Sequence, residues 1–438
     1  MPAAKLKESV MPVERSTVHR LAAHRAEIAR LCRSDEQGCV VALAAAYRAL
    51  SLDEKSISRR AVELVEAVRA QRRTASGVDH LMHEFSLSSQ EGIALMCLAE
   101  ALLRIPDGET MDRLIRDKIS QGDWRAHLGH SGSLFVNAAT WGLMVTGTMV
   151  ATHREDTLGN ALSRVIVRGG EPLIRRGVEF AMNLLGQQFV MGETVDQALE
   201  RSRTNRGRGF THSFDMLGEA ALTTYDAEIY CQAYERAIHT IGQASNRGVI
   251  DGDGISVKLS ALHPRYCRAQ HRRVMEELYP RLLVLAELAA HYRIGFNIDA
   301  EEADRLSLSL ELIERLAFEP SLAGWDGLGV VVQAYQKRAP LVIDHLAELA
   351  RLAERRMMIR LVKGAYWDSE IKRAQIDGLS GFPVFTRKSH TDLSYLVCAA
   401  RLLDMADVIY PQFATHNAHT LSCVERMAVD RAVSNYEF

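Results

Sequence analysis

The sequence predicts an α/β protein in which an all-helical N-terminal domain precedes a (β/α)8 barrel of the TIM type. Apolar residues recur at helical spacing through roughly the first 185 positions, where strand-like alternation is rare. After about residue 205, short β-rich runs alternate with amphipathic segments, a pattern typical of a parallel sheet whose strands are joined by helices. The first β-rich run lacks the glycine fingerprint of a dinucleotide-binding sheet, so a barrel is favoured over a doubly wound sheet.

In the N-terminal half, helical spacing is clearest at Val40–Leu50, Ile93–Leu103 and Leu173–Leu185. The run Ser131–Thr152 carries no charge and is long enough to span a bilayer. Its asparagine, hydroxyl and glycine residues dilute the hydrophobicity that insertion requires. We therefore expect this run to form a helix buried inside the protein rather than a membrane span.

In the C-terminal half, six runs have the length and composition of strands: Gly209–Met216, Ile255–Leu262, Ile294–Ala300, Leu328–Ala334, Met357–Lys363 and Val408–Phe413. Helices are expected between them, at 223–243, 272–291, 302–317, 340–355 and 391–406. Thr223 and Asp226 form a Thr-x-x-Asp start for the first of these helices. Pro280 should kink or divide the second, and Thr391 should cap the last.

A closed barrel of this kind needs eight strands, and Asn435–Phe438 resembles only the beginning of a seventh. The expected organisation is an N-terminal arm over residues 1–40, a helical domain over 41–185, and a barrel over 186–438 that appears truncated in strand seven. We expect the physiological chain to be longer than these 438 residues.

Composition excludes several classes of protein. Lys and Arg total 53 against 55 Asp and Glu, so the net charge is −2 and no nucleic-acid partner is expected. The seven cysteines are scattered and form no Cys-x-x-Cys pair, which argues against a disulfide framework or a cysteine zinc site. The N-terminus has no apolar core of a signal peptide. A cytoplasmic protein without a metal site is the resulting expectation.

Polar residues gather where the candidate strands end, which is where barrel enzymes build their active sites. Lys258 is the least ordinary of them, since a lysine inside an apolar strand needs an anion or a cavity. Asp299 could instead cap the next helix, and the acidic run that it begins with Glu301 and Glu302 fits a helix start better than a divalent metal site. These residues leave two enzyme classes open: a Schiff-base aldolase type using Lys258, or cations that hold an anionic cofactor such as a flavin.

Longer motifs resemble the proline dehydrogenase family, and in particular the N-terminal part of its bifunctional bacterial proline utilisation A group. The motifs in the C-terminal half are DMLGEAAL (215–222), ISVKLSALHPRY (255–266), NIDAEE (297–302), VQAYQ (332–336), RLVKGAYW (360–367) and QFATHN (412–417). The N-terminal half contributes EFSLSSQEGIALMCLAEALLRIPD (84–107) and SLFVNAATWG (133–142). The resemblance covers nearly all of the chain from about residue 40.

The resemblance implies an FAD-dependent enzyme that oxidises L-proline to 1-pyrroline-5-carboxylate by hydride transfer from proline C5 to flavin N5. Electrons would pass to a membrane quinone, which implies peripheral contact with the inner face of the cell membrane. An aldehyde dehydrogenase domain is implied downstream in the full-length chain. No ribbon-helix-helix DNA-binding segment precedes the helical region, so a repressor role is not expected.

The resemblance also assigns roles to single residues. Lys258 would anchor the proline carboxylate, Asp299 and Tyr366 would shape the proline pocket, and Glu219 would pair with substrate-site arginines. The residues implied in FAD binding are Gln333, Arg360, Val362, Gly364, Ala365, Trp367, Thr386, Lys388, Thr391, Ala414, Thr415, His416 and Asn417.

The family's paired arginines, which clamp the proline carboxylate from the last barrel helix, have no equivalent before Phe438. Two alternatives to an active FAD-dependent enzyme therefore remain open: a catalytically incomplete fragment with weak or no FAD binding, and the aldolase-type barrel.

Overall fold

The structure, a computed structural model, describes residues 15–74 and 190–438. The chain divides into two compact units, one made of Met1–Leu64 with Arg203–Phe438 and the other of Val65–Ser202. The helices expected at Ile93–Leu103 and Leu173–Leu185, and the uncharged run Ser131–Thr152, lie outside the described residues. Within the described part of the chain, no helix combines the length and the apolar character that crossing a bilayer requires.

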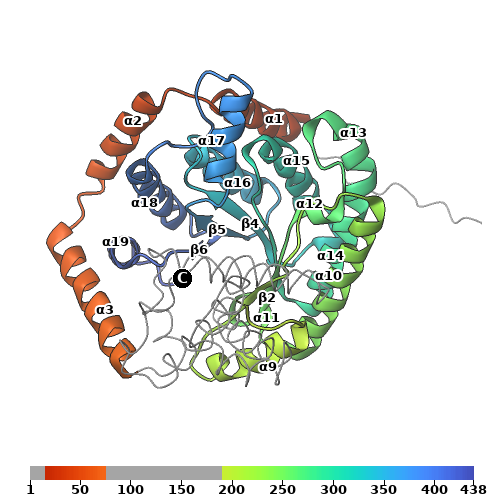
Figure 1. Ribbon diagram of the computed structural model, residues 1–438, viewed down its shortest axis with the longest axis horizontal. Coiled ribbons are helices and arrows are strands. Elements are labelled where there is room, and N and C mark those ends of the chain that lie inside the picture. Colours follow the sequence, from red (N-terminus) through yellow and green to blue (C-terminus); the bar gives the residue numbers. More distant parts are fainter. Residues whose placement is uncertain (1–14, 75–189) are drawn as a thin grey trace, which may run out of the picture. The chain divides into compact units, whose positions relative to one another are not determined.

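Six strands form one parallel sheet in chain order. Figure 1 labels four of them, β2, β4, β5 and β6. They are β1 (Ser213–Asp215), β2 (Gly254–Val257), β3 (Gly295–Ile298), β4 (Leu328–Gln333), β5 (Met357–Val362) and β6 (Ile409–Phe413). Each strand pairs with the next one along the chain. All six expected strands exist, and the predicted α/β fold with a parallel sheet is confirmed.

The last residues of the chain lie beside β6. Phe413 N donates to Glu437 O at 2.8 Å, and Glu437 N donates to Pro411 O at 3.1 Å. These two bonds make an isolated parallel bridge between Gln412 and Glu437. The terminal residues therefore pair with the sheet as the beginning of a further parallel strand would.

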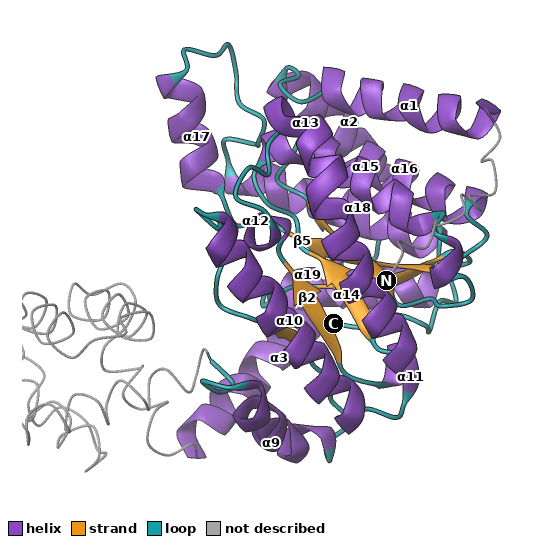
Figure 2. Cartoon of the chain, turned by 90° about the vertical axis from the view of Figure 1, so that its right-hand side faces the viewer, coloured by secondary structure: helices purple, strands orange, loops and turns teal. Residues whose placement is uncertain are grey.

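Helices connect and cover the strands, because each parallel crossover must return the chain to the same end of the sheet. They are α10 (Thr224–Ala244), α11 (Gly248–Asp251), α12 (Leu259–Leu262), α13 (His271–Arg273), α14 (Tyr279–Tyr292), α15 (Leu306–Ala317), α16 (Ala339–Leu352), α17 (Trp367–Ile376), α18 (Lys388–Asp404) and α19 (Ala418–Asp430); α9 (Val195–Arg206) precedes the first strand in the chain. In Figure 2, α12 and α17, which follow β2 and β5, lie on the opposite side of the sheet from α11, which precedes β2. The carboxyl ends of the strands thus share one side.

Two local expectations are confirmed. Thr223 caps α10 in a complete capping box, in which its side chain accepts from Asp226 N and the Asp226 carboxylate accepts from Thr223 N. The segment around Pro280 is divided by a π-helical turn, Val274–Leu278, which separates α13 from α14. A proline at the start of α14 has no N–H to donate, so the helix upstream cannot continue through it with regular hydrogen bonds.

Two other local expectations are wrong. The second half of the run Ile255–Leu262 is not strand: the chain leaves the sheet at Lys258 and forms the buried turn α12. A short apolar run that is buried on all sides has no periodicity to separate strand from helix. Thr391 does not cap α18, because that helix begins at Lys388 and Thr391 lies buried within it.

Three N-terminal helices precede the barrel part: α1 (Arg15–Arg30), α2 (Glu36–Ala49) and α3 (Glu54–Thr74). Helix α1 lies against α15 and α16, and α2 lies against α18 (Figure 1). Ion pairs from α1 support this packing, with Arg20 bound to Glu348 and Arg25 bound to Glu314. The expected domain boundaries at residues 40 and 185 stay a prediction.

We predict that Thr223→Ala lowers the free energy of unfolding by about 1 kcal/mol, because the side chain that satisfies the amide of Asp226 is lost. Urea unfolding followed by circular dichroism measures the change. The neighbouring exposed Thr224, which is inside α10, is the matched control, and Thr224→Ala should change stability much less. Equal losses in the two variants would show that the capping box contributes nothing specific.

Candidate active site

A largely buried ammonium lies at the carboxyl end of the sheet, next to its first three strands. Asp215 is the last residue of β1, Lys258 directly follows β2, and Asp299 directly follows β3. Lys258 Nζ donates to both oxygens of Asp215, at 2.9 and 3.0 Å, and to Asp299 Oδ2 at 2.8 Å. Three neighbouring parallel strands thus deliver one cation and two carboxylates to the same point, as the sequence predicted for Lys258 and Asp299.

Burial differs within this cluster. The side chains of Lys258 and Asp299 are 16% and 15% exposed, whereas Asp215 is 47% exposed. Asp299 is the inner partner of the ammonium, and Asp215 is the partner that solvent or a ligand can reach. A ligand carboxylate could therefore take the place of Asp215 without uncovering the inner pair.

The electrostatics keep Lys258 protonated. Burial is the largest influence and favours the neutral amine, but the charges and hydrogen bonds of Asp299 and Asp215 together outweigh it and raise the pKa of Lys258. Burial also raises the pKa of Asp299, against the lowering effect of the Lys258 charge. A Schiff-base nucleophile needs a neutral amine, so this environment disfavours the aldolase-type alternative.

Arg360 enters the barrel interior from β5 and reaches across to β2. Its Nη1 donates to Ser256 Oγ at 2.9 Å, and Ser256 Oγ lies 3.1 Å from Ser213 Oγ. Among the described residues, this is the one hydrogen bond that the half-buried guanidinium makes. Because a guanidinium carries five donors, Arg360 retains donors for a ligand at this end of the sheet.

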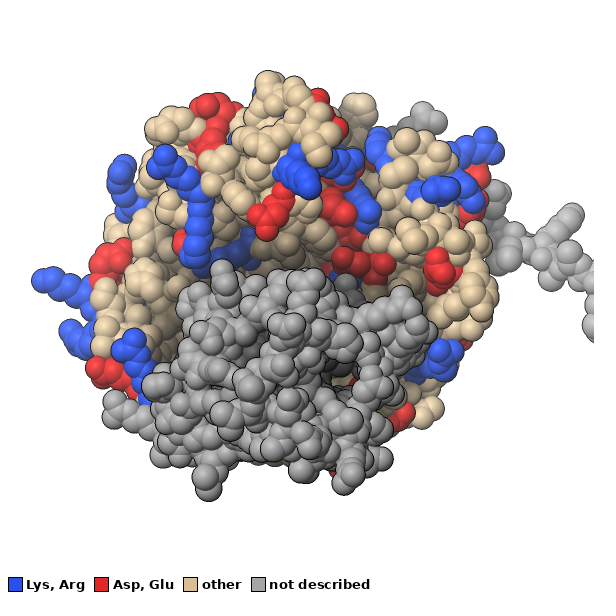
Figure 3. Space-filling view, in the orientation of Figure 1, with Lys and Arg blue, Asp and Glu red and all other residues tan. Residues whose placement is uncertain are grey.

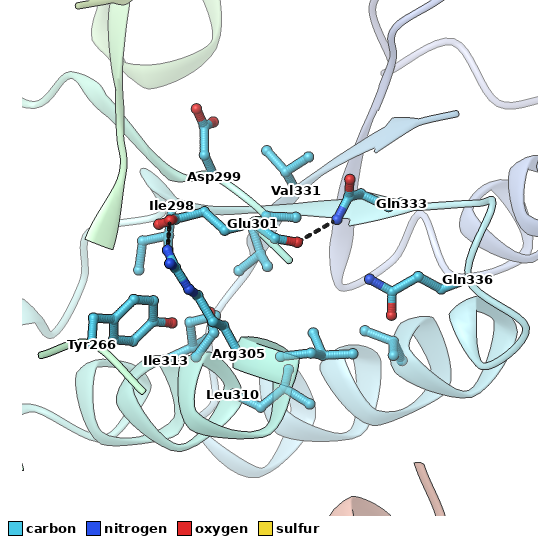
Figure 4. Close-up of a pocket in the computed structure, with 15 residues that line it drawn as sticks. Tyr266, Ile298, Asp299, Glu301, Arg305, Leu310, Ile313, Val331, Gln333 and Gln336 are labelled. Carbon is cyan, nitrogen blue, oxygen red and sulfur yellow. Dashed lines mark hydrogen bonds and ion pairs between the residues drawn. The ribbon is translucent and has the colours of Figure 1, made fainter. Parts of the chain in front are cut away.

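Gln333 joins two loops. Its Nε2 donates to Glu301 O at 2.8 Å, and its Oε1 accepts from Ala365 N at 3.3 Å. The Glu301 carboxylate in turn accepts from Ser260 N at 3.0 Å and from Arg305 Nη1 at 2.5 Å. Figure 4 shows Gln333 and Arg305 both directed at Glu301. These three residues line a pocket, and the Asp299 carboxylate points away from it. The network ties the turn after β2 and the loops after β3 and β5 to one another.

The segment 364–367, which runs from the loop after β5 into the first residue of α17, carries four residues of the predicted site. Gly364 has φ +137°, and a Cβ there would lie 2.5 Å from the ring of Tyr335, so another residue would be strained and would displace the ring. Tyr366 N donates to Tyr335 OH at 3.3 Å, and Tyr366 OH donates to Glu219 Oε2 at 3.3 Å. Burial, and then the charge of Glu219, raise the pKa of Tyr366, which keeps the phenol protonated. Trp367 Nε1 donates to Phe385 O at 2.8 Å.

The start of α18 is rich in cations. Lys363 and Lys388 both bind the carboxylate of Asp392, at 2.5 and 2.6 Å. Burial acts to raise the pKa of Asp392, but its two lysine partners outweigh burial and lower it. Thr386, two residues before Lys388, donates its amide and hydroxyl to Glu36 of the N-terminal arm.

The segment after β6 is held by hydrogen bonds to β5, to α18 and within itself. Ala414 N donates to Leu361 O, and Ala414 O accepts from Tyr395 OH. Asn417 caps α19 by accepting from Thr420 N at 2.9 Å, and Asn417 N donates to Thr415 Oγ1 at 3.1 Å. His416 is exposed between them. These side chains lie at the predicted end of the sheet, and a cofactor role for them stays a prediction.

Sequence reasoning missed several residues that organise the site. Asp215 is one of the polar residues at the predicted strand ends, but the sequence assigned it no role in the site. Glu301 looked like an ordinary acidic helix start, and only its burial beside Ser260 reveals its role. Glu36 had no signal at all, since it meets Thr386 across 350 positions of the sequence.

Charges of both signs surround this end of the molecule. Figure 3 shows Lys and Arg side chains interspersed with Asp and Glu over the described part of the face. The mixture agrees with the near-zero net charge of the whole chain. A compact anion would be recognised here by particular cations such as Lys258 rather than by a broad positive field.

The fold and the site define a barrel-type α/β protein with a protonated lysine and an arginine at the carboxyl ends of its strands. The sequence model of proline dehydrogenase matches residues 198–438, more than half of the chain. The chain therefore belongs to the proline dehydrogenase family, and the resemblance seen in its motifs is confirmed.

A second family model, described as the DNA-binding domain of proline dehydrogenase, matches residues 77–189. That segment lies wholly outside the described residues. The expectation that nucleic acid is not a partner is untested and stays a prediction.

The chain is similar to bifunctional proteins. It is 60% identical over 409 residues to the bifunctional protein PutA of Salmonella typhimurium, a match that covers 92% of this chain and 31% of that protein. It is 63% identical over 373 residues to the bifunctional protein PutA of Escherichia coli, covering 84% and 28%. The chain thus spans about a third of the length of these curated relatives.

A solved structure also resembles this chain in fold and sequence. The crystal structure of a mutant of proline utilization A from Bradyrhizobium japonicum has a TM-score of 0.67 and 46% sequence identity to this chain. The match covers 93% of this chain and 40% of that one.

We predict that Lys258→Met lowers the free energy of unfolding by about 2–3 kcal/mol, because it leaves Asp299 buried without its cation. The value lies at the low end for a broken buried pair because the cluster is partly exposed. The double variant Lys258→Met/Asp299→Leu should recover much of the loss, and Lys372→Met, at an exposed lysine of α17, is the control. If urea unfolding shows the single variant to be as stable as the wild type, the pair is not coupled as described.

Proposed function

We propose that this chain oxidises L-proline to 1-pyrroline-5-carboxylate at the carboxyl end of its strands, with FAD as its cofactor. The observation that carries the proposal is the Lys258 ammonium, kept charged by an inner and an outer carboxylate, in a chain of the proline dehydrogenase family. A partly desolvated ammonium recognises a carboxylate well, because the low local dielectric strengthens the pair.

In this proposal the substrate carboxylate takes the outer place beside Lys258, which Asp215 fills in the structure. Asp299 stays behind the ammonium and keeps it protonated and oriented. Tyr366, bound to Glu219, closes the pocket from the opposite loop. The substrate is thereby held by its charged end, and its ring carbon is left free for the oxidation step.

The donor set of the site fits FAD. Arg360 retains guanidinium donors in the barrel interior. Lys363, directly after β5, and Lys388, at the start of α18, share the carboxylate of Asp392, and the net positive charge that this group keeps would stabilise a diphosphate. Trp367 offers a partly exposed aromatic surface held by Phe385 O. When bound, FAD would supply the acceptor for the hydride that leaves proline C5.

The wider roles rest on the family resemblance. We infer a quinone as electron acceptor, peripheral contact with the inner face of the membrane, and a cytoplasmic location. The word "bifunctional" in the names of the relatives supports an aldehyde dehydrogenase domain as a covalent partner in a longer chain.

We predict that the purified 438-residue chain, reconstituted with FAD, shows flavin absorbance that bleaches when L-proline is added without oxygen. Lys258→Met should retain FAD but need at least about a hundredfold more proline for half-maximal bleaching, because a lost charge-assisted contact costs about 3 kcal/mol. Lys372→Met is the control and should bleach like the wild type. Anaerobic absorbance titrations measure all three proteins.

Each competing explanation predicts a different result. A protein that stays colourless after reconstitution supports the incomplete fragment and contradicts the proposal. Covalent trapping of Lys258 by borohydride in the presence of a carbonyl compound would support the aldolase type instead. Bleaching that is equally sensitive in Lys258→Met and the wild type would remove Lys258 from the substrate site.

A further inference from the structure

The N-terminal arm reaches the segment that precedes α18. The Glu36 carboxylate accepts hydrogen bonds from Thr386 N at 3.0 Å, from Thr386 Oγ1 at 3.1 Å and from His390 Nδ1 at 2.6 Å. Lys337 adds a charge 4.0 Å away, and its Nζ donates to Ser34 O at 2.9 Å. One side chain from the arm thus satisfies three donors at the start of a helix more than 350 residues downstream.

The environment of Glu36 lets it accept these hydrogen bonds as an ionised carboxylate. Its side chain is 19% exposed and the Lys337 side chain 3% exposed, so solvent screens the contact only partly. Burial acts to raise the pKa of Glu36, but the bonds from His390 and Thr386 outweigh burial and lower it. The carboxylate is therefore ionised at neutral pH.

An apolar contact reinforces the ionic one. Leu43, one of the helical residues following Glu36 in α2, forms a core cluster with Phe385 and Val397. Phe385 is fully buried; its N–H donates to Tyr335 O and its carbonyl accepts from Trp367 Nε1. Helix α2 therefore holds Phe385 by packing and the next residue, Thr386, by hydrogen bonds.

The segment held in this way lies beside residues that the family resemblance implies in FAD binding: Thr386 itself, Trp367, which donates to Phe385 O, and Lys388, two residues further along. We propose that Glu36 is a positioning residue, which fixes the start of α18 before FAD binds and so lowers the entropy cost of binding. The inference rests on the proposed function. Because Thr386 donates both its groups to Glu36, its part in binding FAD would be to hold the backbone in place rather than to give up those bonds.

The test compares FAD binding and backbone protection in the full chain. Glu36→Ala should weaken FAD at least about tenfold, measured as the dissociation constant when FAD fluorescence is titrated with apoprotein. Hydrogen exchange of peptides covering residues 384–392 should speed up in the FAD-free variant. Glu36→Gln, which retains an oxygen for Thr386 N but loses the charge, should fall between the two proteins. At saturating FAD, half-maximal bleaching should need the same proline concentration as in the wild type, since Glu36 bonds neither Lys258 nor Asp299.

Glu348→Gln is the matched control, because Glu348 binds Arg20 and so ties the same arm to α16 away from the start of α18. It should leave FAD affinity as in the wild type. Equal weakening in Glu348→Gln and Glu36→Ala would show that general docking of the arm matters, and would overturn the proposal. Unchanged or tighter FAD binding in Glu36→Ala would overturn it too, the tighter result indicating that Glu36 competes with the cofactor. Failure of the wild type to bind FAD would instead refute the proposed function, and the positioning role with it.

Discussion

The ion pairs of the Lys258 ammonium with Asp215 and Asp299 are the interaction on which the rest of the site depends. A lysine at the end of a buried strand is costly unless it is paired, and here the two neighbouring strands each end in or before an aspartate. The pairing explains how charged side chains can lie at the carboxyl end of an otherwise apolar sheet.

A second layer of contacts supports this cluster. Glu301 and Gln333 connect the loops after β2, β3 and β5 through backbone groups, so that a displacement in one loop is transmitted to the others. The arm adds a third layer through Glu36, which holds the start of α18. The carboxyl end of the sheet is therefore built by long-range hydrogen bonds to loop backbone, which is how a site on loops is made rigid.

The sequence predicted the parts of this arrangement that are local. Alternation of β-rich runs with amphipathic helices revealed the parallel sheet, and an isolated lysine in an apolar run revealed Lys258. The sequence could not show whether Leu259–Leu262 is strand or helix, because a short run that is buried on all sides has no periodicity to separate the two. Thr391 misled because a threonine near a helix start resembles a cap, whereas burial against neighbouring helices decides its place. The role of Glu36 could not be predicted, since no local sequence pattern encodes a partner 350 residues away.

The most direct test of the account is the protonation state and ligand response of Lys258 itself. The ¹⁵N chemical shift of Lys258 Nζ, observed by NMR in FAD-loaded protein, reports whether the group is an ammonium or an amine. The account predicts an ammonium at pH 7 whose signal shifts on addition of L-proline but not of prolinamide, which lacks the carboxylate. A neutral amine at pH 7, or the same response to both compounds, would contradict it.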